Sequence, residues 1–370
     1  MQNLVLYRKY RPKSFSEVIG QEHVVRTLKN AIEAGTVSHA YLFSGPRGSG
    51  KTSIARILAK AVNCQNRNGS EPCNKCSSCL EIDQGKAVDL IEIDAASNRG
   101  VDEMRELREG IGFSPSRLKY KVFIIDECHQ LTKEASNALL KTLEEPPSHA
   151  IFILATTEAN KMIPTIISRC QRFDFRKLTL KEIEEKLERI SKAEKVKIEK
   201  EALQLISAAS TGSARDAESL LDQVLSYGAA TKKEEITALE IKDLLGLVDL
   251  ELVSKMVDLI LERKKKEAIN FLNDIFSKGK DPQEFARSLI NYLRQILILQ
   301  INVDFIDEAI GAFTKEEKEK IQQQVKAFKE DSLRTALRLF LKAENEMKYS
   351  FIPQLPLELA VIESLKEEGK

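Results

Sequence analysis

The feature that most constrains this chain of 370 residues is a glycine-rich run, Gly45-Pro46-Arg47-Gly48-Ser49-Gly50-Lys51-Thr52. The run matches the phosphate-binding pattern G-x-x-x-x-G-K-[ST] at each fixed position. Its glycines let successive backbone N–H groups point at phosphate oxygens, and the helix that follows adds its positive end. We expect Lys51 to reach the β- and γ-phosphates and Thr52 to ligate Mg²⁺. An apolar strand at 40–44 and an amphipathic helix at 53–60 flank the run, so the sequence predicts a nucleoside triphosphate site.

A second motif follows the apolar run at 122–125, where two acids stand side by side. The run predicts a buried parallel strand, and open α/β sheets bind ligands at the carboxyl ends of their strands. Asp126 is expected to hold Mg²⁺, and Glu127 to orient or deprotonate the water that attacks the γ-phosphate. We expect His129 to form local hydrogen bonds rather than to catalyse.

Four further polar residues are considered for the same site. A predicted strand at 151–155 is followed by Thr156 and Thr157, whose hydroxyls either cap the strand or lie between the acids and the γ-phosphate. Arg169 precedes a short strand and raises the question of an arginine finger acting on a neighbouring subunit. Arg215 lies in the first turn of a predicted helix, against the preference for acids there. It indicates an anionic ligand nearby, with a salt bridge to Asp216 or Glu218 as the alternative.

Six cysteines are present, and four of them cluster between positions 64 and 79: Cys64, Cys73, Cys76 and Cys79. Four thiolates are enough for a closed tetrahedral Zn²⁺ site, which keeps no open position for water and is therefore structural. Disulfides are the alternative, and a cytosolic location disfavours them.

Length and charge set wider limits. A chain of this length predicts two or three domains, and the net charge of +1 neither requires nor excludes nucleic acid. No apolar run approaches the roughly 20 residues of a membrane span, and the polar start does not resemble a signal peptide, so we expect a soluble, cytoplasmic protein without a membrane partner. The basic-aromatic stretch at 1–20 either wraps a nucleotide base, with Val18 and Ile19 as apolar contacts, or is fastened to the core.

Helical patterns account for most of the remaining sequence. Helices are predicted early in the chain at 21–34, ending at Gly35, and at 100–109 and 133–144. From residue 178 onward strands give way to helices at 179–193, 200–209, 213–226 and 233–245. Beyond residue 248 only amphipathic helices are evident, with examples at 282–300, 314–327 and 333–347, and such a region typically builds subunit contacts.

With these residues in place, the chain resembles the AAA+ ATPases and, among them, the gamma/tau family of bacterial DNA polymerase III clamp-loader subunits. The resemblance covers essentially the whole chain. It is carried by Tyr10-Arg11-Pro12 with Phe15, Ile19-Gly20-Gln21, the four-cysteine insert, Asp126-Glu127-Cys128-His129, Leu139-Leu140-Lys141-Thr142-Leu143-Glu144-Glu145-Pro146-Pro147, Ser168-Arg169-Cys170 and Gly212-Ser213-Ala214-Arg215-Asp216.

The resemblance implies a role for each candidate residue. Thr157 corresponds to the first sensor, Arg169 to the finger that reaches a neighbour's ATP, and Arg215 to the second sensor on the chain's own ATP. The implied nucleotide-binding set is Tyr7, Arg8, Arg11, Pro12, Val18, Ile19, Gly45, Pro46, Arg47, Gly48, Ser49, Gly50, Lys51, Thr52, Ser53 and Arg215. The implied metal ligands are the four cysteines for Zn²⁺, and Thr52 with Asp126 for Mg²⁺.

The resemblance also implies an architecture and partners. We expect a RecA-like α/β domain at 1–178 with a zinc module at about 64–79, a helical lid at 179–243 and a helical collar at 244–370. The expected partners are the delta and delta-prime subunits and further gamma/tau copies in a hetero-pentamer, the beta sliding clamp, and primer–template DNA. ATP binding would open the clamp and grip DNA, and hydrolysis would release the closed clamp. Arg99, Arg105 and Lys141 are candidates for DNA backbone contacts.

Two other functions are weighed against this one. A branch-migration AAA+ motor is disfavoured by the zinc insert and the Ser-Arg-Cys motif. A non-hydrolysing scaffold subunit is disfavoured because Lys51, Thr52, Asp126 and Glu127 are all intact. The chain stops at Lys370, so it is expected to be a gamma-like product or part of a longer tau-like protein. Tethering of a polymerase is not expected of these residues, and a polymerase label would belong to the holoenzyme.

Overall fold

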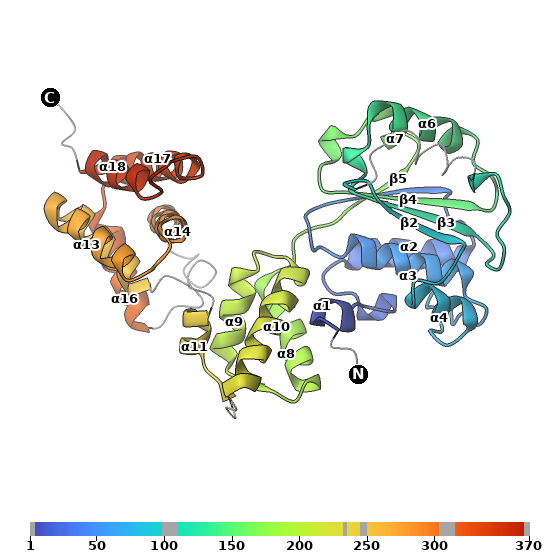
Figure 1. The fold of residues 1–370 in the computed structure, drawn as a ribbon, viewed down its shortest axis with the longest axis horizontal. Helices are drawn as coiled ribbons and strands as arrows, with labels where there is room; N and C mark the ends of the chain where they lie inside the picture. Colours follow the sequence, from blue (N-terminus) through green and yellow to red (C-terminus); the bar gives the residue numbers. More distant parts are fainter. Residues whose placement is uncertain (1–3, 98–109, 232–234, 245–249, 303–314, 366–370) are drawn as a thin grey trace. The chain divides into compact units, whose positions relative to one another are not determined.

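The structure is a computed structural model that describes residues 4–97, 110–231, 235–244, 250–302 and 315–365 (Figure 1). The chain forms two compact units, one of Met1–Ile198 with Ile206–Glu235 and the other of Glu199–Leu205 with Ile236–Lys370. The sequence-predicted domain boundaries after residues 178 and 243 remain predictions. The candidates Arg99 and Arg105 and the helix predicted at 100–109 lie outside the described residues.

A parallel sheet of five strands organises the first unit, in the order β2-β3-β4-β1-β5. Helices cover both faces of such a sheet, which is why β1 and β4 are buried at each residue. Because the strands are parallel, their carboxyl ends share one edge, and the candidate motifs follow those ends. The strands are β1 (Ala40–Ser44), β2 (Leu90–Asp94), β3 (Lys121–Asp126), β4 (Ala150–Thr156) and β5 (Gln171–Asp174).

Alternating side chains place the sheet between two layers of helices (Figure 1). Phe43 faces the core formed with α2 and α3, while its neighbour Leu42 faces the core formed with α6 and α7. On the second face Phe123 and Phe152 stack with ring centroids 5.1 Å apart. The helices are α2 (Glu22–Ala34), α3 (Lys51–Asn63), α6 (Lys133–Glu144) and α7 (Pro164–Ile167), and the smaller elements are α1 (Leu6–Lys9), η1 (Phe15–Glu17), α4 (Ser77–Asp83), η2 (Cys128–Gln130) and η3 (Ala159–Lys161).

Several predicted elements are confirmed with small changes in length. The strand at 40–44 and the helix at 133–144 have the predicted bounds, and the helix predicted at 53–60 extends to Lys51–Asn63. Gly35 ends α2 with a φ of 70°, the left-handed conformation expected of a glycine cap. Lys141 is exposed on α6.

Helices follow the sheet along the chain, as predicted. The first of them, α8, begins with a capping box in which the side chains of Thr179 and Glu182 each bind the other's backbone N–H. The helix predicted at 213–226 continues to Thr231, and the one predicted at 233–245 is shorter. These elements are α8 (Leu180–Ala193), α9 (Lys200–Ala209), α10 (Ala214–Thr231) and α11 (Ala238–Leu244), with two short strands β6 (Lys197–Ile198) and β7 (Glu235–Ile236).

The second unit is built from amphipathic helices around one apolar core. A buried polar network also ties three of them together, because the Gln324 amide accepts from Tyr292 at 2.6 Å and donates to Asp258 at 2.7 Å. The helices are α12 (Leu250–Leu261), α13 (Lys265–Ser277), α14 (Pro282–Ile301), α16 (Lys315–Ala327), α17 (Glu330–Met347) and α18 (Leu355–Ser364).

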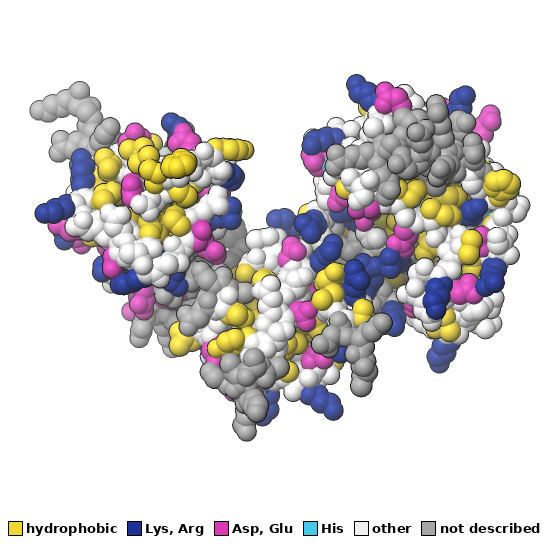
Figure 2. Space-filling view, viewed as in Figure 1, with side chains coloured by type: hydrophobic (Ala, Val, Ile, Leu, Met, Phe, Trp, Pro, Cys, Tyr) yellow, Lys and Arg dark blue, Asp and Glu magenta, His cyan; other side chains and the backbone are white. Residues whose placement is uncertain are grey.

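Apolar side chains also reach the surface of this unit. Figure 2 shows them gathered over the part that carries α17 and α18, where Tyr349, Phe351 and Leu359 are exposed. Among the helices that the structure describes, none combines the length and the apolar character needed to cross a membrane.

Candidate nucleotide site and cysteine cluster

The main candidate site is a cavity of about 750 Å³ in the first unit. Its walls come from the N-terminal arm (residues 4–20), the phosphate loop (residues 45–52), the carboxyl ends of the strands, and the helices α8 and α10. Of the predicted residues, the cavity is lined by Tyr7, Arg11, Pro12, Val18, Ile19, Arg47, Gly48, Ser49, Gly50, Lys51, Thr52, Ser53, Asp126, Glu127, Thr157 and Arg215. Arg8, Gly45, Pro46 and Arg169 are not in its lining.

The phosphate loop needs glycine at two positions because other parts of the chain come very close. A Cβ atom on Gly45 would lie 2.4 Å from the Phe175 carbonyl oxygen, and one on Gly48 would lie 2.0 Å from Ser213 Oγ. Both glycines have positive φ angles. The backbone N–H of Ala214 donates to the Gly48 carbonyl at 3.1 Å, so the loop is fastened directly to the start of α10.

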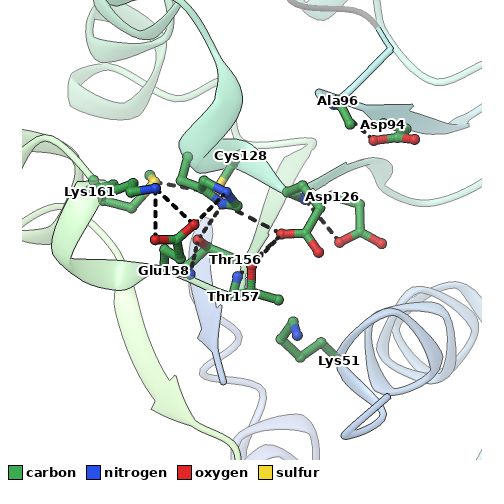
Figure 3. Close-up of polar contacts among 12 residues, drawn as sticks. Lys51, Asp94, Ala96, Asp126, Cys128, Thr156, Thr157, Glu158 and Lys161 are labelled. Carbon is green, nitrogen blue, oxygen red and sulfur yellow. Dashed lines mark hydrogen bonds and ion pairs between the residues drawn. The ribbon is translucent and has the colours of Figure 1, made fainter. Parts of the chain in front are cut away.

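Lys51 extends over the same loop. Its Nζ donates to the carbonyls of Gly45 at 2.7 Å and Pro46 at 2.9 Å. Burial lowers the pKa of Lys51, while the carboxylates of Glu127 and Asp126 act in the opposite direction. Figure 3 shows Lys51 at the start of α3, facing the strand ends that carry Asp126 and Thr157. A cation held there suits a phosphate group.

The two predicted magnesium ligands lie next to each other. Thr52 Oγ1 donates to Asp126 Oδ2 at 2.7 Å, although the residues belong to α3 and β3. The other carboxylate oxygen of Asp126 accepts from the Glu127 backbone N–H at 2.9 Å. A hydroxyl beside a carboxylate is a hard oxygen donor set of the kind Mg²⁺ prefers, so these two side chains fit the ion.

Glu127 has an unusual backbone conformation, with φ 47° and ψ 41°. A non-glycine residue in this left-handed region costs free energy, on the order of 1 kcal/mol, and such outliers concentrate at functional sites. Thr157 donates to Glu127 Oε2 through its hydroxyl at 2.9 Å and its backbone N–H at 3.3 Å. These bonds orient the carboxylate toward the cavity that both residues line.

His129 connects Thr156, Glu127 and Glu158 in a polar network, and Figure 3 shows Thr156 and Glu158 close to each other. His129 Nδ1 lies 3.0 Å from Thr156 Oγ1 and 3.4 Å from Glu127 Oε2, and its Nε2 lies 3.5 Å from Glu158. Glu158 in turn pairs with Lys161 at 2.8 Å. This arrangement agrees with the expectation that His129 forms local hydrogen bonds. The two adjacent threonines have different partners, because Thr156 contacts His129 and Thr157 contacts Glu127.

The arm and α10 meet at an aromatic ring. The Arg215 guanidinium lies over Tyr7, with Cζ 4.8 Å from the ring centroid, and Arg8 Cζ lies 5.8 Å from the same centroid. A hydrogen bond from Arg8 is the main reason that the pKa of Tyr7 is lowered. Burial lowers the pKa of Arg11, which lies near Arg215. Basic side chains therefore gather here, as the dark blue atoms around α1 and α10 in Figure 2 show, and they favour a polyanion.

Some cavity residues were not anticipated from the sequence. Lys186 on α8 and Glu218 on α10 form a buried ion pair at 2.7 Å, and burial raises the pKa of Glu218. Glu218 thus pairs with Lys186, and not with Arg215, which the sequence left open as an alternative to an anionic ligand. Asp94 also lines the cavity, because β2 and β3 place it opposite Asp126. The available clue was that Asp94 ends the largely apolar run at 90–93.

Arg169 lies apart from this cavity. Its guanidinium pairs with Glu144 at the end of α6 and donates to the Thr165 carbonyl at 2.7 Å. The side chain is about one-third exposed, at 32%. The structure therefore does not bring Arg169 to the nucleotide site of its own chain.

The four clustered cysteines converge as predicted. The sulfur atoms of Cys64, Cys73, Cys76 and Cys79 all lie within 4.8 Å of one another, a spacing compatible with four ligands around one tetrahedral ion. Backbone N–H groups of residues 75 and 76 donate to Cys73 Sγ and lower its pKa to about 6, which favours the thiolate that a metal requires. The cluster therefore fits Zn²⁺. Cys128 is separate and buried, and burial raises its pKa.

Three protein-family models match consecutive parts of the chain. The model described as "DNA polymerase III, delta subunit" matches residues 20–179. The model "DNA polymerase III clamp loader subunit, ATPase lid domain" matches residues 182–230, and "DNA polymerase III subunits gamma and tau domain III" matches residues 236–366.

The chain is also similar to curated proteins over nearly its whole length. It is 36% identical over 362 residues to DNA polymerase III subunit gamma of Buchnera aphidicola subsp. Acyrthosiphon pisum, covering 98% of each chain. It is 43% identical over 366 residues to subunit tau of Bacillus subtilis, covering 98% of this chain and 63% of that relative. It covers 61% of the gamma/tau subunit of Mycobacterium tuberculosis, at 38% identity over 96% of this chain. The chain thus spans about three-fifths of these two longer relatives.

Among solved structures, the chain is similar to the RuvB Holliday junction branch migration motor of Thermotoga maritima. The TM-score is 0.51 at 25% sequence identity, covering 68% of this chain and 80% of the other. Together with the lid-domain match, this similarity confirms the predicted fold class.

Proposed function

The chain belongs to the gamma/tau family of DNA polymerase III subunits, and we propose that it is an ATP-hydrolysing motor subunit of a clamp loader. The observation that carries this proposal is one cavity, in which the phosphate loop, the Thr52–Asp126 pair and the Thr157–Glu127 contact lie together. These groups supply phosphate binding, metal ligation and water activation, which are the three requirements of phosphoryl transfer to water.

The binding steps follow from the contacts already described. The loop N–H groups and Lys51 bind the triphosphate, and Lys51 exchanges its two backbone carbonyl partners for phosphate oxygens. Thr52 and Asp126 hold Mg²⁺, which neutralises charge on the phosphates when bound. The arm covers the base and ribose with its apolar residues Val18 and Ile19, while Arg215 contacts the γ-phosphate from α10.

Hydrolysis is assigned to Glu127 and to a neighbouring chain. Glu127 takes a proton from the attacking water, and Thr157 keeps its carboxylate aimed at that water. Arg169 is exposed outside its own cavity, so we assign it to the ATP of an adjacent subunit, where it stabilises the charge of the transition state. The four cysteines hold a structural Zn²⁺ with no open position.

The partners follow from the family rather than from the contacts of this chain. We propose the delta and delta-prime subunits, further gamma/tau copies, the beta sliding clamp and primer–template DNA, with a cytoplasmic location. Branch migration is not favoured, because clamp-loader family models match the chain from residue 20 to residue 366. A non-hydrolysing scaffold is not favoured either, since the groups for phosphate, metal and water are all in one cavity.

The test is ATP turnover by the chain mixed with the delta and delta-prime subunits, with and without clamp and primer–template DNA. Strong stimulation that requires both clamp and DNA is the expected result. Turnover that is indifferent to the clamp would leave an ATPase with a different partner. No ATP binding at all would contradict the assignment of the cavity.

A further inference from the structure

Lys60 is a charged residue buried in α3, with 1% of its side chain exposed. Its Nζ lies 2.7 Å from the Lys13 carbonyl oxygen, 2.8 Å from Asn74 Oδ1 and 2.8 Å from Asp83 Oδ1. An ammonium group has three N–H donors, and here each has an acceptor from a different segment. Burying a charge is costly unless it is paired and hydrogen-bonded in this way, so the site is built for the cation.

The segments around Lys60 are those that carry the four clustered cysteines. Asn74 lies in the turn between Cys73 and Cys76, and Asp83 ends α4, the helix that contains Cys79. Lys60 itself lies one helical turn before Cys64. One ammonium group therefore contacts two segments of the cysteine module (residues 64–83), the turn at Asn74 and the end of α4.

The remaining acceptor belongs to the N-terminal arm. Lys13 lies directly after Arg11 and Pro12, which line the nucleotide cavity. A second bond joins the module to the arm, because Glu71 accepts from the Phe15 backbone N–H at 2.8 Å. The Phe15 side chain is buried in the core of the sheet, which anchors the arm at one point. The bond from Lys60 and the bond from Glu71 of the module hold the backbone on either side of Ser14.

We propose that Lys60 is a positioning residue, through which the cysteine module sets the geometry of the arm and thereby the affinity for nucleotide. The coupling is mechanical. Lys60 bonds to the arm backbone and lies nine residues after Lys51 on α3, so its effect on the cavity is transmitted by the position of the arm. The arm is the direct connection between the two sites. This inference rests on the proposed nucleotide site, and it gives the module a role besides local folding.

The test is Lys60→Met, which keeps the volume of the side chain and removes its charge. We expect about a tenfold rise in the Kd for ATP, from the lost charge-assisted bond to the arm, with zinc content unchanged. Amide hydrogen exchange at residues 8–17 should accelerate. In the assembled complex the KM for ATP should rise while kcat stays the same. Lys75→Met, an exposed lysine in the same module, is the matched control and should match wild type.

A second variant covers the case in which Lys60→Met does not fold. Glu71→Ala removes the acceptor of the Phe15 backbone N–H, together with a partly exposed ion pair to Lys29, and should raise the Kd in the same direction, by a few-fold. In a Cys73→Ser background, which disables the metal site, Lys60→Met should add little to the Kd. The inference would be overturned if a folded, zinc-loaded Lys60→Met or Glu71→Ala protein kept the wild-type Kd for ATP and the wild-type rate of amide hydrogen exchange in the arm. That result differs from failure of the proposed function, in which wild type itself would not bind ATP.

Discussion

The nucleotide cavity has two sides that are built in different ways. At the phosphate side, Lys51, Thr52 and Glu127 come from two short motifs that follow β1 and β3, and the bond from Thr52 to Asp126 links those motifs directly across the end of β4. At the arm and lid side, Tyr7 and Arg215 come from distant parts of the sequence and meet only in the folded unit. The first side depends on local geometry, while the second depends on how remote elements pack, so the second is the place where affinity can be adjusted without losing the chemistry.

The comparison would be incomplete if the two sides of the cavity together could not hydrolyse ATP without a residue from another subunit. Arg169 tests this. Arg169→Ala should leave ATP binding intact and lower turnover about 10⁴-fold in the assembled complex, because an arginine finger stabilises transition-state charge. Steady-state ATPase with partner subunits, clamp and DNA is the measurement. Arg172→Ala is a matched control, since Arg172 is also exposed and pairs with Asp174 at 2.8 Å. Full turnover in the Arg169 variant would show that the chain's own cavity is complete.

Glu127→Gln separates binding from chemistry on the phosphate side. The amide keeps the size and an acceptor for Thr157, but it cannot take a proton from water. We expect turnover to fall about 10³-fold with ATP affinity close to that of wild type. Paired measurements of Kd and single-turnover rate check this. Retention of half the wild-type rate would remove Glu127 from the role of general base.

Lys51→Ala should act on binding itself. The loss of the ammonium group removes the only lysine assigned to the phosphates, and we expect affinity to fall about 10²-fold. ATP affinity should fall at both low and high salt, since the ammonium group of Lys51 is buried. Titration with a fluorescent ATP analogue gives the Kd. An affinity equal to that of wild type would mean that the loop does not use this lysine.

Arg215→Gln probes the opposite side and should have a smaller effect. The variant removes the charge near the γ-phosphate and the contact with Tyr7, and we expect about a tenfold loss of ATP affinity with much less loss for ADP. The difference between the two nucleotides is the informative quantity. Equal losses for ATP and ADP would show that Arg215 acts through Tyr7 and the base rather than through the γ-phosphate.

The smallest expected effect is at the joint between the sheet and α8. Arg176 donates two hydrogen bonds to Glu182 and is the main reason that the pKa of Glu182 is lowered to about 2. A lowered pKa stabilises the folded state above the ordinary value of 4.5, and this contribution disappears as pH falls toward 2. Glu182→Gln should therefore destabilise the unit by about 1 kcal/mol at pH 7 and by less at pH 3. Thermal unfolding at both pH values measures it, and a difference independent of pH would contradict the ion-pair explanation.

The same contrast explains what the sequence could predict. The chemistry of the phosphate loop requires fixed residue types at fixed spacing, so Lys51 and Thr52 were identifiable, and the acids after β3 could be recognised as their partners. The parallel α/β sheet followed from apolar runs that alternate with helical periods. The strand order did not follow, because it depends on which helices pack on which face.

The rest of the site is a product of tertiary structure. Lys186 and Glu218 look like ordinary charged positions on two helices, and only their packing makes them a buried pair in the cavity. The motif around Arg169 was recognisable, but its partner Glu144 was not, since no local pattern links the end of α6 to that arginine. In the second unit the helices were predicted from amphipathicity, whereas the network around Gln324 depends on three of them meeting.

The close approach of Gly48 and Ser213 has a consequence for how this molecule can evolve. Because a Cβ atom at position 48 would lie 2.0 Å from Ser213 Oγ, position 48 cannot accept a side chain while Ser213 stays as it is. Lineages are therefore expected to change the two together or not at all. An alignment of many relatives would then show these positions as a covarying pair, although strands β2 to β5 lie between them in the sequence.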